Sequence, residues 1–510
     1  MNSSPIRNTS ATGSGLRPGL AAGPAAWLAI TAVVAFQLAF EVPALCVLLP
    51  VSLGALFALR RLGSPRVSLY LGMAVGLGVF VPQMLFLWRI FSIAAVPLWL
   101  ILAFFHGVFL LVLNRVEFRW GPGWALALAP VLWCGVEYFR SEIWWLRFSW
   151  FAAGTCLPPG ARGFLVPLGV YGCGALAMMV GALGCRTLEM RRSIRPRWMR
   201  PAQIVVAVIL LVGVVGSVRE VRTADSVQSR VSVAGVQMEF PGVPEVRFAL
   251  ERLRTNQPKA ELLLLSEYTF DGPVPEPVKA WCRRHGKWLV VGGKDPMSGA
   301  LPDGESSSIP ALFRPKGLFP QVPEGEAYFN TAFVINPQGE VAFTQAKSRP
   351  IQFFRDGEPA RERRVWESPW GRLGIPICYD ASYRRVTDDL VRQGVQGLLI
   401  PTMDVEAWGE RQHRLNARMA RLRAVEYQLP VFRVASSGIS QLMDGTGREL
   451  ATAPFPGNGE EIFGTLELRG VTRRLPLDAW VAPASTVVTA GVMVALVVLA
   501  WGSRWQRRAS

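Results

Sequence analysis

The chain has 510 residues, of which 51% are apolar, and a single small soluble domain is therefore excluded. Its formal net charge of +17 would suit a nucleic-acid-binding protein, but the arginines flank apolar segments and do not form one basic stretch. Composition thus favours a protein with several membrane spans.

Eight apolar segments are long enough to cross about 30 Å of hydrocarbon. Seven precede residue 220 and one lies near the C-terminus: residues 21–40, 42–59, 68–88, 92–113, 122–139, 163–184, 202–218 and 485–501. We predict an N-terminal membrane domain of about seven helices (1–219), a polar domain (220–483), and a C-terminal span with a basic tail (484–510).

The distribution of arginines predicts the orientation in the membrane. Sixteen arginines fall on the side that holds both termini, and four fall in the short segments on the other side. Because basic residues are retained in the cytoplasm, both termini are expected there. The polar domain is then expected on the periplasmic or outer side. The first nineteen residues are rich in Ser, Gly and Arg, and the apolar run that follows them lacks a convincing cleavage site, so we expect the first span to be retained.

Strand-like and helix-like segments alternate in the polar domain, which is typical of layered α/β folds. The segments expected to be strands are residues 231–238, 261–268, 287–293, 331–336, 371–379, 397–404 and 431–438. Those expected to be helices are residues 245–257, 277–286, 383–394 and 410–428. A Pro-, Gly- and Ser-rich segment with apolar residues, 297–326, interrupts the pattern and is expected to be either a lid dipping into lipid or a disordered loop.

Three chemically distinctive residues follow apolar strands: Glu267 after LLLLS, Lys347 in FTQAKSRP, and Cys378 in GIPICYD. Groups at the carboxyl ends of neighbouring strands converge on one crevice, so we expect these side chains to meet. A thiol needs a base to become nucleophilic, and Glu267 is the candidate. Lys347 supplies a positive charge that would stabilise an oxyanion. The pattern predicts nucleophilic catalysis by the Cys378 thiol.

Other chemistries have weaker support in the sequence. His285 and His413 do not follow strands, and His106 lies within a predicted span, so a Cys–His hydrolase is disfavoured. Metal-binding clusters and nucleotide-type glycine loops are absent from the sequence, and we expect no metal and no cofactor. Cys282 is the only other cysteine of the polar domain, and no disulfide framework is implied.

The order of Glu267, Lys347 and a Cys378-Tyr379-Asp380 turn resembles the nitrilase superfamily of carbon-nitrogen hydrolases. Seven spans before this domain and one after it resemble the apolipoprotein N-acyltransferase family, as do the aromatic segment 138–158 and the segment 412–440. The resemblance implies an α-helical membrane bundle of about eight spans with an αββα nitrilase-like sandwich. It also implies a location in the bacterial cytoplasmic (inner) membrane.

In function, the resemblance implies that Cys378 takes an acyl chain from a phospholipid and passes it to the α-amine of a diacylglyceryl-cysteine at an apolipoprotein N-terminus. Its catalytic residues would be Glu267, Lys347 and Cys378, with ping-pong kinetics. Its partners would be the phospholipid donor and the apolipoprotein acceptor, without nucleic acid. A membrane-tethered amidase using the same residues and a non-catalytic scaffold remain the alternatives.

Further residues are expected near the substrate. Tyr379, Trp408 and Trp150 are candidates for contact with lipid. The family's K-x-x-L-x-P-F-G-E motif is replaced by KSRPIQFFRDGEPA, in which Glu358 matches the motif's glutamate only if an insertion is allowed. We expect Glu358 to position Lys347 or to assist Glu267.

Overall fold

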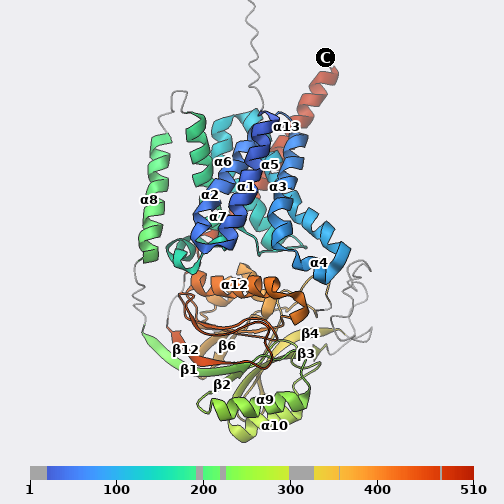
Figure 1. The fold of residues 1–510 in the computed structure, drawn as a ribbon, viewed down its shortest axis with the longest axis vertical. Helices are drawn as coiled ribbons and strands as arrows, with labels where there is room; N and C mark the ends of the chain where they lie inside the picture. The colour runs from blue at the N-terminus through green and yellow to red at the C-terminus, as the bar shows by residue number, and fades with distance from the viewer. Residues whose placement is uncertain are drawn as a thin grey trace, which may run out of the picture.

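The computed structural model describes residues 20–190, 199–218, 226–297, 327–354, 356–470 and 474–509. A bundle of helices stands above a layered α/β domain, and the N-terminal helix starts at the end of the bundle farthest from that domain (Figure 1). The segment expected to be a lid or a disordered loop, 297–326, lies outside the described residues apart from its first residue.

Each of the eight predicted apolar segments forms a helix. The bundle consists of α1 (Ala22–Glu41), α2 (Leu49–Ala58), α3 (Pro65–Gln83), α4 (Phe86–Phe91), α5 (Ala95–Trp120), α6 (Pro122–Tyr138), α7 (Arg162–Glu189), α8 (Met199–Val218) and α13 (Asp478–Ala509). By length and composition, six helical stretches of the described chain can cross a membrane. Because α6 and the apolar part of α8 (Val206–Ser217) are shorter, the predicted count of eight spans is approximate.

Small residues allow α3 and α5 to pack closely. A Cβ atom added to Gly72 would lie 2.8 Å from the backbone of Gly107, and one added to Gly76 would lie 2.7 Å from the Cα of Ala103. Lipid gives little hydrophobic drive for helix association, so such close backbone contact is a main source of stability in a membrane bundle.

The α/β domain is a sandwich of two six-stranded sheets in the described residues, with strand orders β12-β1-β2-β3-β4-β5 and β11-β10-β9-β8-β7-β6. The strands are β1 (Val227–Val236), β2 (Leu262–Leu264), β3 (Trp288–Pro296), β4 (Tyr328–Ile335), β5 (Val341–Ala346), β6 (Val365–Ser368), β7 (Gly371–Gly374), β8 (Gly397–Thr402), β9 (Val431–Ala435), β10 (Ser440–Met443), β11 (Glu449–Ala453) and β12 (Glu461–Arg469). The predicted αββα sandwich is confirmed.

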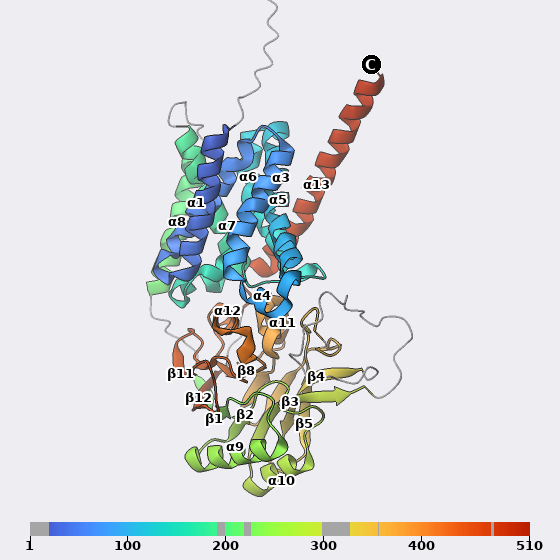
Figure 2. The same ribbon diagram turned by 45° about the vertical axis from the view of Figure 1, so that its right-hand side comes forward.

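Helices cover both outer faces of the sandwich. Helices α9 (Val243–Asn256) and α10 (Glu276–His285) lie at the far end from the bundle, while α11 (Arg384–Arg392) and α12 (Glu410–Tyr427) lie between the sheets and the bundle (Figures 1 and 2). Leu262 and Leu264 of β2 face the core between the sheets, and Leu263 faces the core under α9 and α10. Burial on both faces explains why this strand is a continuous leucine run.

A break in α7 joins the bundle to the α/β domain. At Gly169 the backbone has φ 71° and ψ 174°, a conformation essentially restricted to glycine. The helical turn that follows has free N–H groups, and that of Tyr171 donates to the Asp478 carboxylate (2.9 Å) while that of Val170 donates to Glu426 on α12 (3.0 Å). Asp478 also pairs with Arg384 of α11 (2.5 Å), so one helix end holds three other helices.

Replacing Gly169 by Ala should destabilise the whole protein. The new Cβ would lie 2.0 Å from the Asp478 carboxylate, in a backbone conformation that alanine avoids. We expect a loss on the order of 2–4 kcal/mol, seen as a lower midpoint of thermal unfolding by tryptophan fluorescence in detergent. Gly184→Ala in the same helix, where nothing lies within 4 Å, is the control and should be neutral or slightly stabilising. Equal midpoints for the two variants would contradict this account of the junction.

Candidate active site

The three residues singled out by the sequence come together at strand ends. Glu267 follows β2, Lys347 follows β5, and Cys378 opens a 3-10 turn after β7. The Lys347 Nζ lies 2.7 Å from Glu267 Oε1, and both side chains are fully buried. The backbone of Met403 links Glu267 to Cys378. Its N–H donates to Glu267 Oε2 (2.8 Å), and its carbonyl accepts from Cys378 Sγ (3.6 Å).

Lys347 is held between two carboxylates. Besides Glu267 it pairs with Asp356 at 2.6 Å, and Asn330 Nδ2 bridges the two acids at 2.6 Å and 2.8 Å. Asp356 also accepts hydrogen bonds from Tyr268 Oη (2.9 Å) and from the N–H of Ile351 (2.7 Å). A single ammonium group therefore lies between two buried carboxylates.

Asp356 was missed by sequence reasoning, which favoured Glu358 for this position. The Glu358 side chain is exposed, and its backbone N–H bonds to the carbonyl of Tyr328, so the accessory role expected of it does not fit its position. Asp356 and Glu358 both belong to the RDGE segment, and this segment was the signal in the sequence that could have pointed to Asp356. Its folding brings the aspartate, two residues earlier, onto Lys347.

Burial sets the proton affinities of the site. It raises the pKa of Glu267, as does the nearby Asp356 carboxylate, while Lys347 and Asn330 act in the opposite direction. Burial and the Glu267 charge raise the pKa of the Cys378 thiol well above its ordinary value, despite the nearby Lys347. For Lys347, burial favours the neutral amine, but Asp356 and Glu267 outweigh it and raise the pKa. The resting site therefore holds a neutral thiol beside a charged lysine.

The backbone around the thiol is strained. Cys378 has φ 48°, a left-handed conformation that a residue with a side chain adopts at a cost. The Asp380 carboxylate stabilises the turn by accepting N–H groups from Ile377 (3.1 Å), Ser348 (3.0 Å) and Arg349 (2.6 Å). This turn fixes the position of the sulfur at the strand end.

A second polar group borders the sulfur. Asn416 Nδ2 lies 3.8 Å from Cys378 Sγ and donates to Asp404 Oδ1 (2.8 Å). Burial alone would raise the pKa of Asp404, but Arg433 at 2.5 Å and His413 outweigh it and lower the pKa. His413 is buried against Phe455 and lies near Asp404, so we assign it a structural role.

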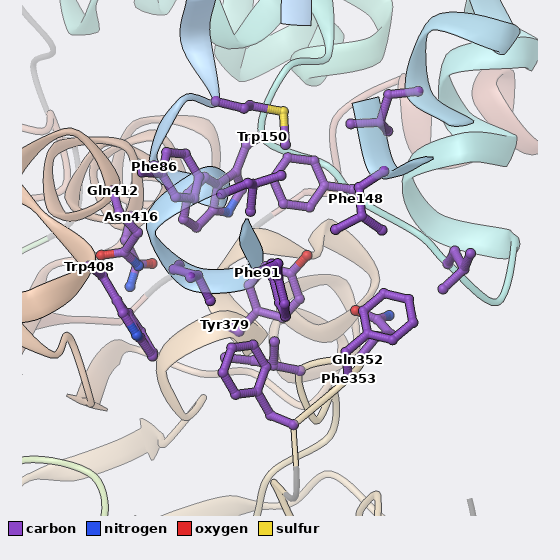
Figure 3. Close-up of a pocket in the computed structure, with 18 of the residues that line it drawn as sticks. Phe86, Phe91, Phe148, Trp150, Gln352, Phe353, Tyr379, Trp408, Gln412 and Asn416 are labelled. Carbon is purple, nitrogen blue, oxygen red and sulfur yellow. The ribbon is translucent and has the colours of Figure 1, made fainter. Parts of the chain in front are cut away.

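An apolar cavity adjoins the sulfur between the bundle and the α/β domain. Figure 3 shows aromatic side chains from both parts facing one another across it, among them the predicted Tyr379, Trp408 and Trp150. Its lining is Met84, Phe86, Leu87, Ile90, Phe91, Leu98, Ile101, Leu102, Leu146, Arg147, Phe148, Trp150, Ile351, Gln352, Phe353, Phe354, Cys378, Tyr379, Trp408, Gln412 and Asn416. The cavity is suited to a hydrocarbon chain that ends at the thiol.

Exposed apolar residues lie on the bundle elements that line the cavity. Helices α4 and α5 line the cavity, and Trp88, Leu100 and Phe104 on them are exposed, as are Leu85 and Ile93 just outside α4. Exposed apolar surface of this extent marks contact with lipid or a partner. Within the described residues, no group of three or more His, Cys, Asp or Glu is arranged to hold a metal, and Cys282 and Cys378 are both free thiols.

Two family models match the chain. Residues 23–183 match the apolipoprotein N-acyltransferase N-terminal domain, and residues 255–461 match carbon-nitrogen hydrolase. Among solved structures, the nitrilase-superfamily protein Nit3 of Saccharomyces cerevisiae is 20% identical with a TM-score of 0.36, covering 47% of this chain and 90% of Nit3.

Curated relatives divide into two kinds. A deaminated glutathione amidase of Yersinia enterocolitica is 26% identical over 33% of this chain and 54% of that protein. The apolipoprotein N-acyltransferase of Pasteurella multocida is 24% identical over 65% of this chain and 67% of its own length. That of Allorhizobium ampelinum is 25% identical over 78% of this chain and 79% of its own length. The amidase thus shares only a part, whereas the similarity to the apolipoprotein N-acyltransferases runs through both bundle and α/β domain.

Proposed function

We propose that this enzyme transfers an acyl chain from a phospholipid, through a thioester on Cys378, to the α-amine of a diacylglyceryl-cysteine at an apolipoprotein N-terminus. The observation that carries the proposal is the position of Cys378, which lies beside the buried Glu267–Lys347 pair and also lines the apolar cavity under the bundle. A hydrolase of small polar amides would have no use for this hydrocarbon-sized lining.

In the first half-reaction, Glu267 takes the thiol proton as the sulfur attacks the ester carbonyl of the lipid. Lys347 stabilises the resulting oxyanion. When the carbon–oxygen bond breaks, Glu267 returns the proton to the departing oxygen, which leaves a lysophospholipid and an acylated Cys378. Because burial keeps the thiol protonated, proton removal and attack are coupled.

In the second half-reaction, the acceptor amine attacks the thioester carbonyl, and Glu267 takes the amine proton. Collapse of the intermediate forms the amide and releases the sulfur, which recovers its proton from Glu267. The apolar lining of the cavity limits access of water and so protects the thioester from hydrolysis.

We place the α/β domain (within 220–483) on the periplasmic or outer side of the bacterial inner membrane, between the membrane domain (1–219) and the C-terminal span (484–510). Support comes from the end of the bundle farthest from the α/β domain, where α2, α5 and α7 end (Figure 1). Arg60, Arg61 and Arg186 gather there around Glu189, which fits a cytoplasmic end.

Mass spectrometry of the intact protein tests the proposal. After exposure to phospholipid vesicles, we expect an added acyl mass that maps to Cys378 and is removed by hydroxylamine. Cys378→Ser should show no hydroxylamine-labile mass and should lose transfer to a diacylglyceryl peptide by at least about 10³-fold, since the nucleophile is lost. Full transfer by this variant would contradict the proposal, and ammonia release from small amides without lipid would favour an amidase.

The rate should fall on the acid side of its pH profile at a higher pH than free glutamic acid would give. Glu267 must be ionised to accept the thiol proton, and burial raises its pKa, so the base is lost sooner as the pH falls. The measurement is kcat/KM for thioester formation against pH. A profile that is flat down to the ordinary glutamate range would contradict the assignment of Glu267 as base.

Asp356→Asn should move this acid limb to lower pH. The Asp356 charge raises the pKa of Glu267, so its removal lowers that pKa and keeps the base ionised in more acidic solution. The same profile measured for Glu358→Gln, which removes the exposed carboxylate two residues away, should match the unaltered protein. An unmoved limb in Asp356→Asn, or an equal shift in both variants, would argue against the coupling of the two acids through Lys347.

A further inference from the structure

Two arginines from different parts of the protein contact the turn that carries Cys378. Arg147 belongs to the loop between α6 and α7 and lines the cavity with Cys378. Arg349 follows Lys347 by two residues, and its N–H donates to Asp380 in the nucleophile turn (2.6 Å). The same turn holds the Arg147 loop, because Tyr383 Oη donates to the carbonyl of Arg147 (3.0 Å).

Neither guanidinium has a partner among the described residues. The Nε atoms of Arg147 and Arg349 are buried without a hydrogen bond, and neither side chain forms an ion pair there. Burial lowers the pKa of Arg349, and the positive charges of Arg147, Arg363 and Arg385 lower it further, while the Glu142 charge acts in the opposite direction. Partly buried cations without a counter-charge are costly, and proteins retain them mainly where a ligand supplies the missing anion.

The nearby carboxylates are already engaged. Glu142 accepts the N–H of Arg384 (3.0 Å) and the hydroxyl of Tyr171 (3.1 Å) at Oε1, while its Oε2 is buried without a hydrogen bond among the described residues. Asp380 accepts three backbone N–H groups, and Asp389 pairs with Arg363 and Arg392. Arg147 therefore brings positive charge to the cavity, and Arg349 lies on the same nucleophile turn. A phosphate group matches two guanidinium groups in charge and geometry.

We propose that Arg147 and Arg349 bind the phosphate of the acyl donor, so that the enzyme recognises a glycerophospholipid by its phosphate during the first half-reaction only. The inference rests on the proposed function and adds the origin of donor selectivity. A diacylglyceryl-cysteine carries no phosphate, so the pair has no role in binding the acceptor. Since the phosphate is common to phospholipids, different headgroups should be accepted.

The test compares two donors with identical acyl chains: phosphatidylglycerol, and diacylglycerol, which lacks the phosphate. Acylation of Cys378 in the full-length protein is followed by intact mass in neutral detergent. The unaltered protein should load from the phospholipid at least about tenfold faster, the value expected for a charge-assisted contact worth about 1.4 kcal/mol. In Arg147→Gln/Arg349→Gln this preference should disappear through a slower phospholipid rate, with loading from diacylglycerol unchanged.

A second arm isolates the later step. Protein preloaded from a p-nitrophenyl ester of the same fatty acid should transfer its chain to a diacylglyceryl peptide equally well with or without the two arginines. A misfolded variant would fail this arm, so normal transfer shows that the site is intact. Arg284→Gln on α10, at the far end of the α/β domain, is the charge-matched control and should keep the phospholipid preference (Figure 1).

Each result bears on the inference. Equal loading of the unaltered protein from both donors, or a double variant that keeps its preference, would overturn it while leaving the thioester mechanism in place. Failure of the unaltered protein to acylate Cys378 from any donor, including the p-nitrophenyl ester, would instead overturn the proposed function. Binding of inorganic phosphate that needs the two arginines but leaves loading from phosphatidylglycerol unchanged would assign the pair to a free anion and overturn its role in lipid binding.

Discussion

The structure of the site depends on one buried ammonium group between two carboxylates. Lys347 is inaccessible to solvent, as are Glu267 and almost all of Asp356. Isolated in such a place, each charge would be strongly unfavourable, but together with Asn330 and Tyr268 they satisfy one another. Loss of Lys347 would leave two buried carboxylates without a counter-charge near the thiol. The arrangement therefore fixes both the geometry and the proton affinity of the base.

The second constraint is the attachment of this site to a membrane bundle. The turn that carries Cys378 continues into Ser382 and Tyr383, and the hydroxyl of Ser149 donates to the carbonyl of Ser382 (2.7 Å) while Trp150 Nε1 donates to its hydroxyl (2.8 Å). A loop between two bundle helices thus braces the nucleophile turn directly. The break in α7 at Gly169 provides a second attachment, because the N–H groups that follow it donate to Glu426 and Asp478. The apolar cavity lies where these two parts meet, which makes it a property of the whole chain.

Much of this architecture was predictable because it follows from local patterns. The apolar segments correctly predicted the bundle helices, and strand and helix alternation correctly predicted a layered α/β domain. Its form as a sandwich came from the resemblance to the nitrilase superfamily. Glu267, Lys347 and Cys378 meet as predicted, although the rule of neighbouring strand ends explains this only in part. Glu267 and Lys347 follow strands of one sheet, whereas Cys378 follows β7 of the other. Tyr379, Trp408 and Trp150 were expected near the substrate, and all three line the cavity.

The positions of Asp356 and Arg147 were not predicted, because their contacts do not follow from the spacing of residues in the sequence. Asp356 reaches Lys347 through the fold of an irregular loop, and alignment to a motif pointed to its neighbour Glu358. Arg147 meets the nucleophile turn only after the bundle docks on the α/β domain.

A structure of the acyl-enzyme, trapped with a phospholipid donor, tests the central claim most directly. We expect continuous density from Cys378 Sγ into the cavity lined by α4 and α5, with Lys347 still held between Glu267 and Asp356. An acyl chain bound to another residue, or one that runs from Cys378 away from the cavity toward the aqueous surface, would contradict the account.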